Sequence, residues 1–72
     1  MDFTLKGEFI QLDKLLKVAG LVGTGGEAKL LIQDGLVLVD GEVETRRGRK
    51  IRAGMRIDFD AVSLLVTNKQ DL

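Results

Sequence analysis

The chain of 72 residues contains no cysteine, which excludes disulfides and cysteine-based metal sites. It also contains no histidine, so the most common general base and metal ligand of proteins is absent. There is no tryptophan or tyrosine, and we assign the three phenylalanines, Phe3, Phe9 and Phe59, to the hydrophobic core. An aromatic platform for stacking single-stranded nucleic acid is therefore not expected.

Long apolar runs are also absent, and none reaches the roughly 18 residues that span a membrane. No signal peptide pattern follows Met1. Hydrophobic residues nevertheless make up 44% of the sequence, which is ordinary for a globular protein and argues against disorder. We therefore expect one small domain over residues 1–72, cytoplasmic, monomeric and without membrane association.

The charges are balanced in number but not in position. Eleven basic and eleven acidic residues give a formal net charge of zero. Residues 46–56 nevertheless hold six basic side chains and no acidic one, namely Arg46, Arg47, Arg49, Lys50, Arg52 and Arg56. Such an unscreened cluster can neutralise phosphates, and arginine adds bidentate phosphate contacts. The alternative is a solvated run of charge without a binding role.

Hydrophobic periodicity predicts two helices in the first half of the chain. Apolar residues spaced i, i+3, i+4, i+7 indicate a helix over about residues 11–19, with Lys14 and Lys17 on its polar side. A second helix is predicted from Thr24 to about residue 33. Thr24 and Glu27 have capping-box spacing, in which the hydroxyl accepts from the Glu27 amide and the carboxylate returns to the Thr24 amide.

Strands are predicted in the second half. Asp40-Gly41 is a strong signal for a type I′ turn between strands at residues 37–39 and 42–45. Further strands are expected near residues 57–59 and over 62–67, with a short edge strand at residues 1–5 and a frayed tail at residues 68–72.

Gly25 and Gly26 fall in the first turn of the second predicted helix, where glycine costs up to about 1 kcal/mol relative to alanine. One explanation is that bare amides are left open to a phosphate, with Lys29 one turn further on. The other is close packing of this turn against the first helix. The sequence leaves both open.

An enzyme is not expected, and no cofactor or metal is implied. The closest carboxylate sets on predicted strands are Glu42 with Glu44 and Asp58 with Asp60. Each pair would share one face of a strand, but nothing in the sequence places it in a pocket. We interpret both pairs as solvated.

Three runs carry a family resemblance: QLDKLL from residue 11, EAKLLI from residue 27 and GLVLVDG from residue 35. Their combined spacing resembles the RNA-binding domain of ribosomal small-subunit protein four (the S-four domain), over a core of about residues 8–67. Within that family, GGEAK at residues 25–29 and ETRR at residues 44–47 are similar to small stand-alone bacterial proteins of the YaaA/YbcJ type.

The resemblance implies an α+β fold built on an αL motif. Two N-terminal helices would pack on a small, bent antiparallel sheet of about four to five short strands. The helix pair and adjoining loop would bind structured RNA, with ribosomal or transfer RNA as candidates, and Lys14 and Lys29 would face it. Gln11 and Gly25 stand where larger members often have arginine, and Met55 stands where members commonly have aspartate.

The basic cluster and the resemblance together predict a module that recognises RNA shape and backbone through a basic surface. The expected site residues are Gln11, Lys14, Lys17, Gly25, Gly26, Lys29, Arg46, Arg47, Arg49, Lys50 and Arg52. The competing hypothesis is a small protein-interaction adaptor that binds no nucleic acid and docks its partner on the acidic remainder of the surface or through an edge strand.

Overall fold

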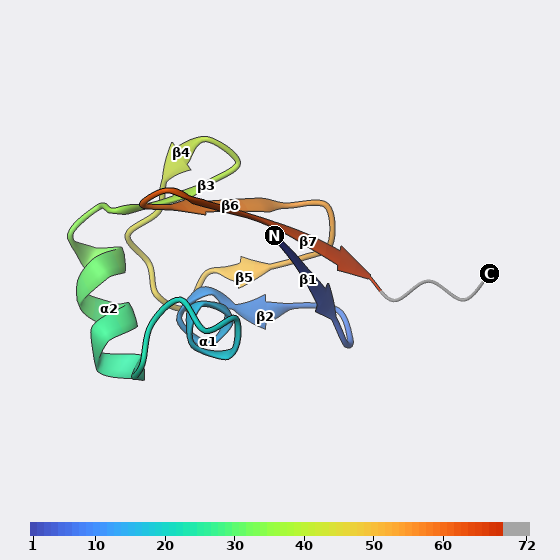
Figure 1. Cartoon of the computed structure of the whole chain (residues 1–72), viewed down its shortest axis with the longest axis horizontal. Coiled ribbons are helices and arrows are strands. Elements are labelled where there is room, and N and C mark those ends of the chain that lie inside the picture. Colours follow the sequence, from blue (N-terminus) through green and yellow to red (C-terminus); the bar gives the residue numbers. More distant parts are fainter. Residues whose placement is uncertain (69–72) are drawn as a thin grey trace.

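The computed structural model describes residues 1–68, which form two helices and seven strands (Figure 1). In chain order these are β1 (Asp2–Leu5), β2 (Ile10–Gln11), α1 (Leu12–Val18), α2 (Gly25–Gln33), β3 (Val37–Val39), β4 (Glu42–Val43), β5 (Lys50–Ile51), β6 (Arg56–Phe59) and β7 (Val62–Asn68). Neither helix of this described part is long and apolar enough to cross a membrane. Asn68 closes β7 instead of starting the predicted frayed tail, and the rest of that tail lies outside the described residues.

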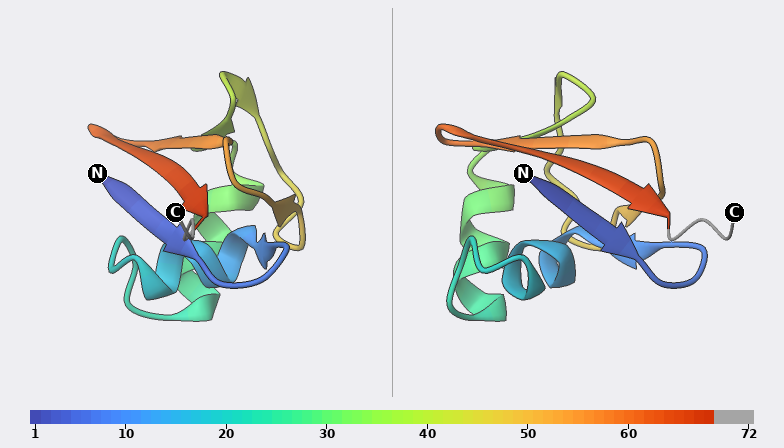
Figure 2. Two further views of the ribbon diagram at one scale, coloured as in Figure 1. Left: turned by 90° about the vertical axis from the view of Figure 1, so that its right-hand side faces the viewer. Right: turned by 45° about the vertical axis from the view of Figure 1, so that its right-hand side comes forward.

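Five of these strands form one sheet in the order β1-β7-β6-β3-β4, and both helices lie on one side of it (Figures 1 and 2). This sheet is mixed, not wholly antiparallel as expected, because β1 pairs with β7 in parallel, with Phe3 opposite Val66. Parallel neighbours need a long connection, and here almost the whole chain lies between the two strands. β1 is an edge strand, as predicted.

The core lies between the helices and the sheet. The predicted apolar stripe of α1 is fully buried at Leu12, Leu15 and Leu16. α2 contributes Ala28 and Ile32, which are also fully buried. These helix residues belong to one cluster with strand residues that include Val37, Ile51, Ile57, Leu64 and Val66. The helix periodicity therefore identified the faces that pack inward.

The β3–β4 hairpin has the predicted turn. Asp40 and Gly41 have φ angles of 51° and 86°, the positive pair that a type I′ turn requires. Asp40 also fastens the hairpin to β6, because its amide donates to the Arg56 carbonyl at 2.8 Å and its carboxylate accepts from the Arg56 amide at 2.9 Å. These two hydrogen bonds hold the turn of the β3–β4 hairpin against the start of β6.

After β4 the chain crosses from the five-stranded sheet to the helix layer (Figure 2). There β5 pairs with β2 in a separate antiparallel ribbon. Neither strand was expected from the sequence. Residue 11 is predicted to begin the first helix, and residues 50–51 fall within the basic cluster, for which the sequence predicts no strand. Strands of two residues carry no periodic signal, and their pairing joins distant parts of the chain.

Candidate nucleic-acid interface

Five of the six residues of the basic cluster, all but Arg56, lie on residues 44–52, which we call the crossing segment. This segment is docked on the start of α1. The Leu12 amide donates to the Arg49 carbonyl at 2.9 Å, and the Asp13 amide donates to the Arg47 carbonyl at 3.0 Å. The first amides of a helix have no partner within the helix. Since the Gln11 side chain makes no cap hydrogen bond, the crossing segment itself caps α1 and is held against it.

The β2–β5 ribbon brings further predicted residues together. Ile10 pairs with Ile51, and Gln11 pairs with Lys50. Ile51 is fully buried and Ile10 packs against the core. Because successive side chains of a strand alternate between faces, Gln11 and Lys50 share the opposite, outer face. The structure therefore places Gln11 and Lys50 side by side at the start of α1.

Glu44 was expected to be solvated, but it is a buried anion. Only 6% of its surface is exposed. Its Oε2 accepts from Arg46 Nε at 3.0 Å, and its Oε1 accepts from Arg46 Nη2 at 3.1 Å and from Arg49 Nη1 at 2.6 Å. The hydrogen bonds from Arg46 lower the pKa of the Glu44 carboxyl from 4.5 to about 2, with Arg49 adding to the effect and burial opposing it. Glu44 therefore stays ionised and ties the end of the hairpin to the crossing segment.

The expectation of an unscreened cluster is wrong for three of its six members. Arg46 and Arg49 pair with Glu44, and Arg56 pairs with Asp58 at 3.2 Å. Within residues 1–68, the remaining exposed site cations form no salt bridge. On the crossing segment these are Arg47, Lys50 and Arg52, and on the helices they are Lys14, Lys17 and Lys29. Of the four carboxylates interpreted as solvated, Glu44 and Asp58 each take part in ion pairs.

The N-terminus of α2 has the predicted cap with one change. The Thr24 hydroxyl accepts from the Glu27 amide at 3.1 Å, but the Glu27 carboxylate accepts from the Gly23 amide at 2.8 Å instead of the Thr24 amide. Among the described residues, a Cβ added at Gly25 would meet no neighbour within 4 Å, and one at Gly26 would approach only the Thr24 hydroxyl at 3.9 Å. Close packing against α1 therefore does not explain the two glycines, and the open-amide hypothesis stays a prediction.

Phe9 does not lie in the core as expected. It was assigned to the core, but 40% of its surface is exposed. Lys50 Nζ lies 4.9 Å from the centroid of its ring, and Arg52 Cζ lies 5.7 Å from it. The signal that could have located it is alternation, since Phe9 and Ile10 are adjacent in an extended segment and cannot both point inward.

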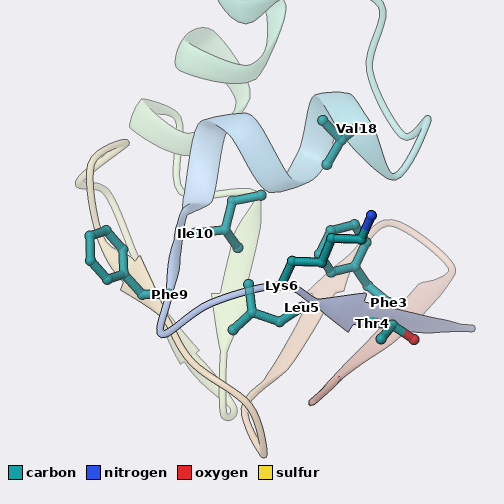
Figure 3. Close-up of a pocket in the computed structure, with 7 residues that line it drawn as sticks. All are labelled: Phe3, Thr4, Leu5, Lys6, Phe9, Ile10 and Val18. Atoms are coloured by element: carbon teal, nitrogen blue, oxygen red, sulfur yellow. The ribbon is translucent and has the colours of Figure 1, made fainter. Parts of the chain in front are cut away.

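An open hollow of about 350 Å³ lies between β1, the residues that lead into α1, and α1 itself (Figure 3). The residues that line it are Phe3, Thr4, Leu5, Lys6, Phe9, Ile10 and Val18. These lining residues, all within the described part of the chain, offer an apolar wall with one lysine and one threonine. No residue of the crossing segment lines this hollow, but the hollow meets the basic surface at Phe9, whose ring lies against Lys50 and Arg52.

Comparison with known proteins gives a consistent result. A sequence model of the S4 domain matches residues 3–67. The chain is 43% identical over 61 residues to YbcJ of Escherichia coli (strain K12), named as a candidate RNA-binding protein, and the match covers 85% of this chain and 87% of YbcJ. It is 38% identical over 53 residues to RlbA of Bacillus subtilis (strain 168), named as a candidate ribosome maturation protein, covering 74% of this chain and 75% of RlbA.

The fold is shared as well. The solution structure of Escherichia coli YbcJ superposes with a TM-score of 0.71 and 42% sequence identity, covering 92% of this chain and 85% of that one. That structure is described as revealing an αL motif involved in RNA binding. The expected architecture, two helices on a small sheet in an αL arrangement, is therefore confirmed.

Proposed function

The chain belongs to the S4 (S-four) domain family, as its resemblance indicated, and we propose that it binds structured RNA through the crossing segment, the outer face of the β2–β5 ribbon and the exposed side of α1. We propose no catalytic role. Residues 1–72 would act as a single binding domain, and their cytoplasmic location and monomeric state stay predictions.

The observation that supports this proposal most directly is the capping of α1 by the crossing segment. The hydrogen bonds from Leu12 and Asp13 to the carbonyls of Arg49 and Arg47 hold the crossing segment beside the helix. Lys14 follows in the first turn of α1, so its ammonium and the guanidinium of Arg47 come from adjacent backbone. Because the backbone that carries these cations is already held in place, binding a phosphate backbone costs side-chain entropy but little backbone ordering.

The site contains two kinds of basic residue. Arg46 and Arg49 hold Glu44 and thereby shape the crossing segment. The unpaired cations, Arg47, Lys50, Arg52, Lys14 and Lys17, would contact phosphates. Arg46 would serve both to hold Glu44 and to contact a phosphate, since 73% of its side chain stays exposed while it bonds Glu44.

The N-terminus of α2 would extend this surface. α1 and α2 pack against each other. A Cβ added at Gly25 would meet no atom of the described structure within 4 Å, so the backbone there is open. Lys29 is exposed one turn further on. We assign Gly25, Gly26 and Lys29 to the periphery of the RNA footprint, because the Glu27 carboxylate lies at the same helix end and opposes an anion there.

The relatives support RNA as the partner. YbcJ is named for RNA binding and RlbA for ribosome maturation, so ribosomal RNA is the first target class to test. RNA helices are recognised largely through phosphates, 2′-hydroxyls and shape, which suits a surface of lysine and arginine.

The competing hypothesis of a protein-interaction adaptor has one specific observation in its favour. Three large apolar side chains are more than half exposed on α2 and the hairpin region, namely Leu30 at 62%, Leu36 at 52% and Val43 at 57%. A partner protein could cover them.

Two measurements test the proposal. The first is fluorescence anisotropy of a labelled hairpin RNA titrated with the protein, for which we expect saturable binding that high salt abolishes. The second uses the absence of tryptophan and tyrosine, because the near-ultraviolet absorbance of the purified protein then reports almost only bound nucleic acid. Absorbance that is lost after nuclease treatment and removal of the digested nucleotides supports RNA binding. Purification with a protein partner, without RNA and without hairpin binding, would support the adaptor.

A further inference from the structure

We infer that Phe9 stacks on one unpaired nucleotide of the bound RNA while Lys50 and Arg52 contact the adjacent phosphates. This inference rests on the proposed function and adds to it a contact with a base. It reverses the expectation that the chain has no aromatic side chain available for stacking.

Phe9 is placed for such a contact by its exposure. Its neighbour Ile10 is half-buried against the core, whereas Phe9 exposes 40% of its surface. Figure 3 shows the Phe9 ring on the opposite side of β2 from the side chains of Ile10 and Leu5. The ring is therefore directed away from the apolar interior, although burying it would favour folding.

The ribbon register explains which side chains surround the ring. Gln11 pairs with Lys50 and Ile10 with Ile51, so continuing the register places Phe9 opposite Arg52. Strand alternation then puts Phe9, Gln11, Lys50 and Arg52 on the outer face of the ribbon, with Ile10 and Ile51 beneath them. Arg47 and Lys14 each lie three residues along the chain from this face, before Lys50 and after Gln11.

The distances agree with that register. Lys50 Nζ lies 4.9 Å and Arg52 Cζ 5.7 Å from the ring centroid, within the range of cation–π attraction. Arg52 is also positioned by a long hydrogen bond from Nη1 to the Glu8 carbonyl at 3.5 Å. Neither cation forms a salt bridge within residues 1–68.

An exposed aromatic ring beside two unpaired cations has the composition of a nucleotide site. A base can stack on the ring or on the guanidinium plane, and the cations can bind the phosphates that flank it. A single exposed phenylalanine serves one base, which fits an unpaired nucleotide beside a paired stem better than a long single strand.

The alternative is that Phe9 only holds Lys50 and Arg52 in place and so stabilises the ribbon. Both roles predict that a substitution of Phe9 affects the protein. They differ in whether the effect depends on an unpaired base in the RNA, and the experiment is built on that difference.

The probes are two hairpin RNAs of the same sequence, one with a single-nucleotide bulge and one fully paired. We expect wild-type protein to bind the bulged hairpin more tightly. Phe9→Leu keeps an apolar side chain but removes the π face, and it should weaken binding of the bulged hairpin about tenfold while leaving the paired hairpin nearly unchanged. Thermal midpoints of both proteins are measured in parallel.

Phe9→Trp gives a second readout, because it introduces the only tryptophan of the chain. A stacked base quenches indole fluorescence, so we expect strong quenching by the bulged hairpin and little by the paired one. Equal losses for both hairpins in Phe9→Leu, or no loss for either, would overturn the inference while leaving RNA binding intact. Failure of the wild-type protein to bind either hairpin would overturn the proposed function together with the inference.

Discussion

Arg49 lies against the buried carboxylate of Glu44, with Nη1 2.6 Å from Oε1. Arg46 bonds the same carboxylate through both Nε and Nη2. The most basic part of the chain is therefore organised around one acidic residue. This arrangement separates the arginines that shape the crossing segment from the cations that are left to contact a ligand, and it makes Glu44 the anchor of the proposed site.

The first prediction concerns that anchor. Glu44→Gln should lower the free energy of unfolding at pH 7 by about 1–2 kcal/mol, a value that allows for screening of the exposed Arg46. Because the pKa of Glu44 falls from 4.5 to about 2 on folding, its stabilisation is present above pH 4.5 and is lost as the pH falls toward 2. Urea denaturation of wild type and variant between pH 7 and pH 2 measures this.

Glu42→Gln is the matched control, since Glu42 is exposed on the same hairpin and forms no salt bridge within the described residues. It should change stability by no more than about 0.5 kcal/mol. A stability gap between wild type and Glu44→Gln that stays constant down to pH 2 would contradict the assigned ion pair.

The second prediction concerns the cap of α2. Thr24→Ala removes the hydroxyl that accepts from the Glu27 amide and should lower stability by about 1 kcal/mol. Thr24→Ser keeps the acceptor and should retain most of the stability. The test is the denaturation midpoint in urea, and equal midpoints for alanine and wild type would show that the hydroxyl contributes nothing.

The third prediction concerns the salt dependence of RNA binding. If about five phosphate contacts form, a plot of log K against log salt should have a slope of roughly −3.5 to −4.5. Anisotropy titrations from low to moderate salt give this slope. Affinity that does not change with salt would exclude a surface based on phosphate contacts.

The fourth prediction concerns the form of the RNA. With one exposed aromatic ring and several cations, the protein should bind a hairpin more tightly than a poly-pyrimidine strand of equal length. Competition between the two RNAs for the same labelled probe measures the preference. Equal competition by the unstructured strand would contradict recognition of RNA shape.

Features set by neighbouring residues could be predicted from the sequence. The leucine spacing of α1, the Thr24 cap and the Asp40-Gly41 turn all depend on a few consecutive residues, and each occurs in the structure. The fold followed from the family resemblance, which combines several such signals.

The missed features depend on contacts between distant residues. The β2–β5 ribbon pairs Ile10 with Ile51 and Gln11 with Lys50, which lie 41 and 39 positions apart in the chain. The exposure of Phe9 follows once residues 9–11 are recognised as extended, because neighbouring side chains then point to opposite faces. The burial and pairing of Glu44 were not predicted. Its partners, Arg46 and Arg49, follow it in an irregular part of the chain, where neither the helix period nor the strand period indicates which side chains meet.

The central claim is that unpaired cations held at the start of α1 bind the RNA, and matched Arg→Gln substitutions test it most directly. Arg47 is exposed and has no salt bridge within residues 1–68, whereas Arg56 lies on β6 and pairs with Asp58. Lys69, a basic residue of the predicted tail, lies outside the described residues, so Arg56 serves as the control.

The measurement is the affinity for one hairpin RNA at fixed low salt, for wild type, Arg47→Gln, Lys29→Gln and Arg56→Gln, with thermal midpoints recorded for all four. We predict that Arg47→Gln weakens binding about tenfold and reduces the salt slope by about 1, that Lys29→Gln weakens it less, and that Arg56→Gln leaves it nearly unchanged. If Arg56→Gln weakens binding as much as Arg47→Gln at equal stability, the attraction is diffuse and no site at the start of α1 exists.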